Sequence, residues 1–295
     1  RKRELQEEAW SDLMHASTTN NAKLFWLTIN SPLLAGREVE ISKGIIDEPT
    51  WVLHFSNIYT ESQSPQVLPD SSDSCIVFTP EEIIKAINSL SSNKAPGPDG
   101  VPADVYKSEP LIWGPLLANV INAVAHLGFP ASWGASNIIP IFKKGDRNVP
   151  SCYRPISLLN STAKVIGAAI LERMAAWADS HNFFSNGQYG FRKKLSTVDQ
   201  GLNFHLISCK YVLAKHESLH VAFMDLSQAF DSVKREKLWA ILYKIGLEPP
   251  LVDFLIKMHA STTASILLDD EGQTSRQINI DKGVRQGCIM APFFF

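Results

Sequence analysis

The sequence predicts an α+β fold, in which helices and strands alternate along the chain. Segments with helical apolar periodicity, such as residues 161–178 and 196–214, alternate with short apolar runs such as residues 136–142 and 152–159. The 295 residues are 45% hydrophobic and 20% charged, which is typical of a globular protein with a sizeable core. At this length we expect one large domain or two unequal ones.

The N-terminal part of the chain predicts a helical extension followed by a linker. Residues 1–17 and 48–59 look helical, and the residues after them are rich in Ser, Pro and Asp. We therefore expect a boundary near Ser74, with a helical extension and linker over residues 1–74 and a second unit over residues 75–295.

The second unit opens with signals for a capped helix and a stiff loop. Thr79 precedes an apolar-periodic run, Pro80 suits a first helical turn, and Glu82 completes a capping box. The run ends at SSNKAPGPDGVP, residues 91–102, where Pro and Gly exclude regular structure. We expect a tight loop that can approach a ligand's backbone closely.

Two hairpins are predicted further along the chain. The strands expected over residues 136–142 and 152–159 flank a basic tip, KKGDRNVPS. The strands expected over residues 263–268 and 276–280 flank DDEG, which has the composition of a hairpin turn.

A strand over residues 219–226 is predicted to end in Asp225, with helices over residues 233–246 and 249–261. A carboxylate at a strand end is held rigidly at the edge of a sheet and is a natural ligand for a hard cation. Asp231 follows at the expected start of the next helix, where a carboxylate is also a routine cap. Taken alone, Asp225 fits a structural role as well as a catalytic one.

Composition and charge exclude several classes of protein. The net charge of −2 gives no global basic footprint, so nucleic-acid contact would depend on local basic clusters. The four cysteines lie far apart without a Cys-x-x-Cys pair, which argues against a disulfide framework and a zinc module. No run reaches the roughly 18 apolar residues of a membrane span, and the charged N-terminus does not resemble a signal peptide. We expect an intracellular protein with no membrane partner.

Five sequence segments occur in a characteristic order: NKAPGPDG, IIPIFKKGDRNVPSCYRPISLLN, GQYGFRKKLST, FMDLSQAFDSV and GVRQGCIMAP. In this order they resemble the reverse transcriptase of LINE-type (non-LTR) retrotransposons, from about Thr79 to the last residue. The resemblance implies a right-hand polymerase fold, of which this chain holds the fingers and part of the palm. It also implies an RNA-directed DNA polymerase that uses an RNA template, a DNA primer, deoxynucleoside triphosphates and Mg²⁺.

The resemblance assigns roles to residues of the nucleotide site. Asp225 matches the palm aspartate that binds the catalytic magnesium ions. Phe230 matches the aromatic residue that rejects a ribose 2′-hydroxyl, because a flat ring leaves no room for an extra oxygen. Gln286 and Gly287 match the Gln-Gly pair that packs against the new base pair and the nucleotide sugar. The finger residues that grip the triphosphate are matched by three basic residues: Lys143, Lys144 and Arg154.

Further basic residues are candidates for contact with the template backbone. Lys143 and Lys144 also fit a solvated hairpin tip, and the basic residues after Gly190 also fit a charged helix start. The template candidates are Arg192, Lys193, Lys194 and Arg285.

The resemblance also implies a catalytic site that this chain completes only in part. Two-metal polymerase chemistry needs several carboxylates, and the family supplies the others from an aromatic-x-Asp-Asp motif after the Gln-Gly pair. The chain stops before such a motif, so we expect a truncated palm, no thumb and no activity of the chain alone. Asp269 and Asp270 precede Gln286, the reverse of the family order, and are interpreted as turn residues. A non-catalytic nucleic-acid-binding remnant is the alternative function, and the oligomeric state stays open.

Overall fold

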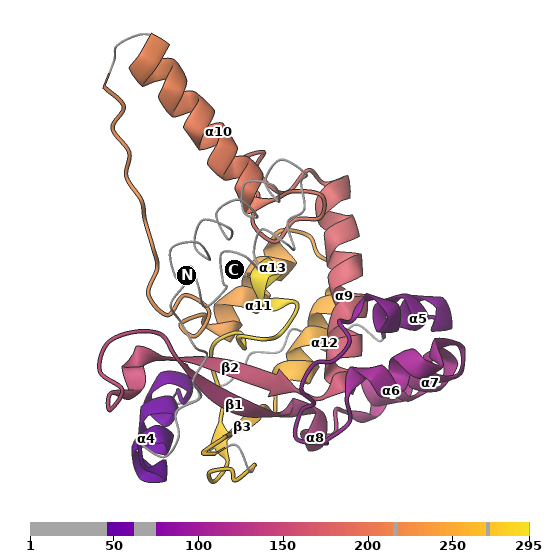
Figure 1. Ribbon diagram of the computed structural model, residues 1–295. Coiled ribbons are helices and arrows are strands. Elements are labelled where there is room, and N and C mark those ends of the chain that lie inside the picture. The colour runs from indigo at the N-terminus through magenta and orange to yellow at the C-terminus, as the bar shows by residue number, and fades with distance from the viewer. Residues whose placement is uncertain (1–45, 62–74, 215–217, 270–271, 295) are drawn as a thin grey trace, which may run out of the picture.

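The computed structural model describes four stretches of the chain, residues 46–61, 75–214, 218–269 and 272–294. Within them, helices surround a four-stranded sheet, in agreement with the predicted mixture of helices and strands (Figure 1). The helix expected over residues 1–17 and most of the expected linker lie outside the described residues.

The sheet has the strand order β2-β1-β3-β4. β1 (Ala135–Phe142) pairs antiparallel with β2 (Tyr153–Leu159), which confirms the first predicted hairpin. β3 (Thr263–Ile266) runs parallel to β1 and antiparallel to β4 (Ile278–Asn279), which confirms the second. β2 therefore lies at one edge of the sheet.

Helix α4 (Glu48–Tyr59) coincides with the helix predicted over these residues and packs on the sheet. Its N-cap residue, Asp47, accepts a hydrogen bond from the Thr50 backbone N–H (3.3 Å). Trp51, Phe55 and Tyr59 recur every four residues, so they share one buried face of the helix. The division of the chain into two domains near residue 74 stays a prediction. The cluster under α4 includes five residues of the strands: Ile138, Tyr153, Ala264, Ile266 and Ile278.

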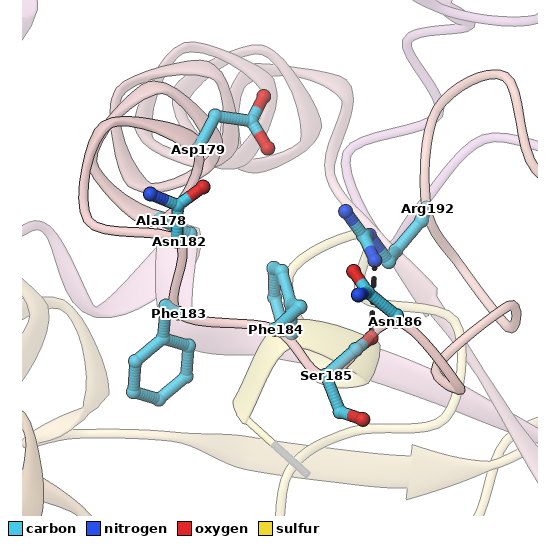
Figure 2. Close-up of a pocket in the computed structure, with 8 residues that line it drawn as sticks. All are labelled: Ala178, Asp179, Asn182, Phe183, Phe184, Ser185, Asn186 and Arg192. Atoms are coloured by element: carbon cyan, nitrogen blue, oxygen red, sulfur yellow. Dashed lines mark hydrogen bonds between the residues drawn. The ribbon is translucent and has the colours of Figure 1, made fainter.

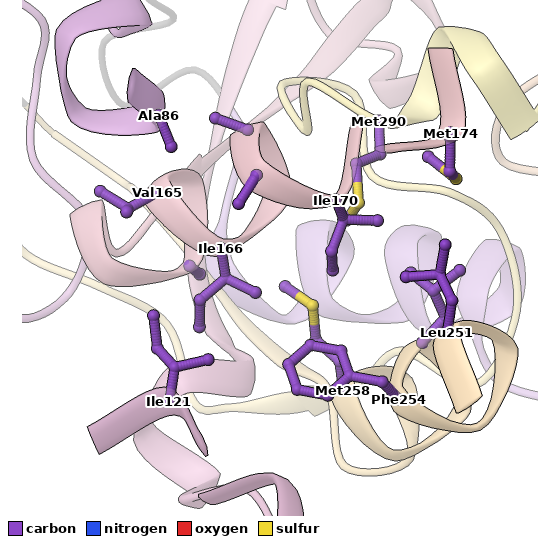
Figure 3. Packing of buried hydrophobic residues seen from close by; sticks show 14 of the residues in the cluster. Ala86, Ile121, Val165, Ile166, Ile170, Met174, Leu251, Phe254, Met258 and Met290 are labelled. Atoms are coloured by element: carbon purple, nitrogen blue, oxygen red, sulfur yellow. The ribbon is translucent and has the colours of Figure 1, made fainter. Parts of the chain in front are cut away.

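A larger core lies among the remaining helices (Figure 3). Its central element, α9, carries Ile166 and Ile170, which belong to the same buried cluster as Phe254 and Met258 of α12. The capping box predicted at Thr79 is confirmed at the start of α5. The bounds of these helices are α5, Pro80–Ser89; α9, Ser161–Ser180; α11, Arg235–Lys244; α12, Pro249–His259; and α13, Ala291–Phe294.

Three helices before β1 were not predicted: α6 (Ala103–Ser108), α7 (Pro110–Leu127) and α8 (Ala131–Gly134). In the part of the chain that the structure describes, α7 is the one helix long and apolar enough to cross a membrane. It nevertheless packs on α5, so closely that a Cβ at Gly114 would meet Ile84 Cγ1 at 2.3 Å. A core helix of a globular protein passes the same length and composition test, so α7 is weak evidence for a membrane span.

The strand predicted over residues 219–226 is wrong. Residues 218–226 follow α10 (Thr197–Cys209) and its π-helical extension, and they pair with no described strand. Figure 1 shows α10 projecting from the molecule and this segment returning as an extended trace. Phe223 and Met224 are 87% and 95% exposed. A strand requires a neighbour to bond its N–H and C=O groups, and the apolar pattern alone does not supply one.

Candidate nucleotide site

The turn at residues 227–232 and the segment at residues 283–288 form one unit. The Val284 N–H donates to the Phe230 carbonyl oxygen (2.8 Å), and the Gly283 N–H donates to the Val233 carbonyl oxygen (2.8 Å). Gly283 has a φ of 81°, and a Cβ there would lie 2.9 Å from the Asp231 carbonyl oxygen. These contacts bring together two motifs that the sequence analysis assigned to the nucleotide site.

The Gln286-Gly287 pair lies against the outer edge of β2. The Ser157 N–H donates to the Gln286 carbonyl oxygen (2.6 Å). Gly287 has a φ of 116°, and a Cβ there would lie only 2.4 Å from the Ser157 carbonyl oxygen. Glycine is therefore required at residue 287, both by the backbone conformation and by the close approach of β2.

Asp231 is 4% exposed and accepts two side-chain hydrogen bonds. The Tyr59 hydroxyl donates to Oδ1 (2.9 Å), and Gln286 Nε2 donates to Oδ2 (3.0 Å). Burial raises the pKa of Asp231, while these two hydrogen bonds act to lower it. Burial and the Asp231 carboxylate raise the pKa of Tyr59, which keeps the hydroxyl protonated. Asp231 does not cap the next helix as expected, because α11 begins only at Arg235.

Tyr59 is a site residue that the sequence analysis missed. It lies in the predicted N-terminal extension, 172 residues before Asp231 in sequence. An aromatic residue at a helical core position signals burial, and the periodicity of α4 indicated that much. The hydroxyl group of Tyr59 also indicated a hydrogen-bond partner, since a buried tyrosine usually has one.

Two buried arginines lie beside the Gln-Gly segment. Arg235 donates through Nε to the Gly283 carbonyl oxygen (3.0 Å), and Arg285 donates through Nη1 to the Gly134 carbonyl oxygen (3.0 Å). Burial lowers the pKa of both guanidinium groups. The expectation that Arg285 contacts the template is not met in this structure. Arg285 is 5% exposed, so its side chain is enclosed by the protein. There it supports the segment that carries Gln286 and Gly287.

The basic residues of the first hairpin lie at its exposed end. Arg154 lies on β2 opposite Ile141 of β1. Because side chains alternate between the two faces of a strand, Lys143 continues the face that carries Ile141 and Arg154. Tyr153 points to the other face, where it packs with α4. Lys143 and Lys144 are exposed near the tip, and Arg154 is exposed on the face of β2 that α4 leaves open.

The basic segment after Gly190 borders a pocket of about 430 Å³ at the end of α9 (Figure 2). Arg192 Nη1 donates to the Ser185 carbonyl oxygen (3.3 Å), and its guanidinium lies 5.4 Å from the centre of the Phe184 ring. Lys193 pairs with Glu172 of α9, and Lys194 is exposed. Template contact by these three basic residues stays a prediction. The pocket is lined by Ala178, Asp179, Asn182, Phe183, Phe184, Ser185, Asn186 and Arg192.

Asp225 lies in the exposed segment 218–226 and not at the edge of the sheet, where it was expected. Among the described residues, no group of three or more His, Cys, Asp or Glu side chains is placed to hold a metal ion. Both oxygens of Asp231 already accept hydrogen bonds, and Asp269 accepts one from the Gln273 N–H (2.8 Å) within the β3–β4 turn. The described residues therefore do not assemble the donors that a pair of magnesium ions requires.

The family profile described as reverse transcriptase (RNA-dependent DNA polymerase) matches residues 141–295. The match covers more than half of the chain, and the chain belongs to the reverse transcriptase family. The RNA-directed DNA polymerase from mobile element jockey of Drosophila melanogaster is 32% identical over 244 residues, which are 80% of this chain. The probable RNA-directed DNA polymerase from transposon BS of Drosophila melanogaster is 30% identical over 228 residues, which are 73% of this chain.

A third relative is the retrovirus-related Pol polyprotein from type-1 retrotransposable element R2 of Popillia japonica, 26% identical over 169 residues, or 56% of this chain. The matches confirm the predicted resemblance to non-LTR retrotransposon reverse transcriptases. The matched regions span 25%, 24% and 22% of the jockey, BS and R2 proteins.

Proposed function

We propose that this chain forms the template- and nucleotide-binding part of an RNA-directed DNA polymerase of a non-LTR retrotransposon. The observation that carries the proposal is the contact between the turn that holds Phe230 and the segment of Gln286 and Gly287, which lies against the edge of β2, in a chain of the reverse transcriptase family. The proposed ligands are an RNA template, a DNA primer and deoxynucleoside triphosphates. The free state of the four cysteines supports an intracellular location.

In DNA synthesis the oxygen of the primer 3′-hydroxyl attacks the α-phosphorus of the nucleotide and forms a new P–O bond. The bond to pyrophosphate breaks, and the hydroxyl proton is released to water. The residues around β2 serve binding and orientation. Arg154 and Lys143 supply positive charge for the triphosphate, and the Phe230 ring limits the space beside the sugar. Gln286 and Gly287 lie at the β2 edge, and we place the sugar and the new base pair against them.

Reverse transcriptase domains generally use divalent metal ions, and Asp225 is the proposed catalytic carboxylate and metal ligand. The described donors do not complete a magnesium site. We therefore propose that synthesis requires carboxylates besides Asp225 and that this chain alone binds its ligands without extending a primer. The incomplete set of metal-binding donors among the described residues also favours the second candidate function, a non-catalytic nucleic-acid-binding remnant.

Replacing Phe230 by Val is expected to reduce the preference for a deoxynucleotide over a ribonucleotide by about tenfold, because the smaller side chain admits the 2′-hydroxyl. The measurement is the Kd of each nucleotide for the chain bound to an RNA template and a DNA primer without a 3′-hydroxyl, so that no synthesis is needed. Phe204, which lies in α10 and is 42% exposed, supplies the matched control variant Phe204→Val. An unchanged preference in Phe230→Val would remove this residue from the proposed site.

A further inference from the structure

The side chains of Tyr59, Asp231 and Gln286 form a hydrogen-bonded chain across three segments. Tyr59 ends α4, Asp231 lies in the turn before α11, and Gln286 lies against β2. The Tyr59 carbonyl oxygen also accepts hydrogen bonds from the Asp281 N–H (3.0 Å) and the Lys282 N–H (3.2 Å). These backbone contacts hold the end of α4 against the same segment that carries Gln286.

The chemistry of the three groups determines the direction of each hydrogen bond. An ionised Asp231 only accepts, so the Tyr59 hydroxyl and the Gln286 amide must both present hydrogen atoms to it. The nitrogen and the oxygen of a side-chain amide have nearly the same shape. This hydrogen-bonding requirement therefore assigns the nitrogen and the oxygen of Gln286. Gln286 Nε2 consequently faces Asp231 (3.0 Å), and Oε1 remains as an acceptor on the other branch of the amide.

We propose that Tyr59 and Asp231 are positioning residues that orient the Gln286 amide, so that its carbonyl oxygen accepts a hydrogen bond from the bound nucleotide. The inference rests on the proposed function, because it takes Gln286 as a nucleotide contact. Gln286 is half-buried and the adjacent Gly287 is exposed, so the amide lies at the boundary between the buried network and solvent. In this way Tyr59, which lies outside the family motifs, takes part in nucleotide binding.

The nearly isosteric substitution Asp231→Asn tests the orientation directly. Asn has one acceptor and one donor where the carboxylate has two acceptors. If the Asn oxygen keeps the Tyr59 hydroxyl, its NH₂ group faces Gln286, which must then rotate its amide to present Oε1 inward. The opposite arrangement leaves the buried Tyr59 hydroxyl hydrogen without its acceptor, which is costly. Asp231→Asn is therefore expected to invert the Gln286 amide.

The first arm of the experiment follows the Gln286 side-chain amide by NMR in the 295-residue chain labelled with ¹⁵N-glutamine, with Gln286→Met identifying the signal. We expect slow exchange of one amide hydrogen with water in the original chain, at least tenfold faster exchange in Tyr59→Phe, and a displaced signal in Asp231→Asn. Tyr243→Phe is the matched control, because the Tyr243 hydroxyl donates to Asp253, and neither residue takes part in the hydrogen bonds that join Tyr59, Asp231 and Gln286. Unchanged exchange in Tyr59→Phe together with an undisplaced signal in Asp231→Asn would overturn the proposal.

The second arm measures the Kd of the next complementary deoxynucleotide for the chain bound to template and primer. We expect Asp231→Asn and Gln286→Ala each to weaken binding about tenfold, which is the effect of one lost hydrogen bond to the ligand. If Gln286→Ala weakens binding and Asp231→Asn does not, the positioning role is refuted while the nucleotide site stands. If Gln286→Ala has no effect, Gln286 is not a nucleotide contact, and the proposed site and this inference fail together.

Discussion

Replacing Arg235 by Ala is expected to lower the free energy of unfolding by about 3 kcal/mol. Arg235 is buried, and its guanidinium binds the carbonyl oxygens of Gly283 (3.0 Å) and His259 (3.0 Å). It also bonds Thr262 Oγ1 (2.9 Å) and the Ile280 carbonyl oxygen (2.8 Å). The side chain therefore joins α11 to the end of α12, to the sheet and to the loop that leads to Gln286.

The expected magnitude is a balance of opposing effects. Thr262 Oγ1 still donates to the Ile280 carbonyl oxygen (2.7 Å), so the substitution leaves mainly the Gly283 and His259 carbonyl oxygens without a donor. Each orphaned acceptor costs about 1–3 kcal/mol, and the cavity adds to this cost. Removing a buried charge beside Arg285 returns part of it, because burial and Arg285 both lower the pKa of Arg235.

Urea unfolding of Arg235→Ala measures the difference, with Arg276→Ala as the control. The Arg276 side chain is exposed, and its backbone N–H, which donates to Glu48, survives the substitution. The control should therefore stay within about 0.5 kcal/mol of the original chain. Equal stabilities of the two variants would contradict the anchoring role of Arg235.

Replacing Gly287 by Ala is expected to destabilise the chain by about 2–3 kcal/mol and to weaken nucleotide binding at least tenfold. An alanine at a φ of 116° is strained by about 1–3 kcal/mol. Its Cβ would lie 2.4 Å from the Ser157 carbonyl oxygen, a backbone atom that no side-chain rotation can move. The segment must then leave the β2 edge and lose the hydrogen bond between Ser157 and Gln286.

The same substitution at Gly201 is a control with the opposite expected sign. Gly201 lies within α10, and a Cβ there meets no atom within 4 Å. Gly201→Ala should stabilise the chain by about 0.5–1 kcal/mol, because alanine loses less conformational entropy in a helix. Urea unfolding of both variants tests the pair, and similar shifts at the two positions would contradict the steric argument for Gly287.

The parts of the fold that the sequence predicted correctly are those specified by local signals. The capping box at Thr79 specifies the start of α5, and the apolar runs around KKGDRNVPS specify β1 and β2. Helix α7 was missed because residues 110–127 combine apolar residues on several faces with an internal Pro115. The strand expected over residues 219–226 failed because strand formation depends on a partner elsewhere in the chain.

In the candidate site too, the sequence identified the residues that a local motif marks and missed the contacts that depend on the whole fold. Phe230, Gln286 and Gly287 were assigned from their motifs, and the structure brings their segments together, while their role in nucleotide binding stays a prediction. Tyr59 was missed because its contact with Asp231 depends on how α4 docks, which no local pattern encodes. Arg285 was assigned to the template because a positive charge in a motif indicates a phosphate contact, whereas the surrounding fold buries it.

The proposed function is tested by template binding and primer extension of the 295-residue chain, measured together. An RNA template with a labelled DNA primer is titrated at several salt concentrations, and extension is then assayed with Mg²⁺ and deoxynucleotides beside Asp225→Asn. We expect binding that weakens steeply with salt in both chains and extension in neither. Absence of binding at low salt would contradict the proposed template site. Extension that Asp225→Asn abolishes would contradict the claim that further carboxylates are required.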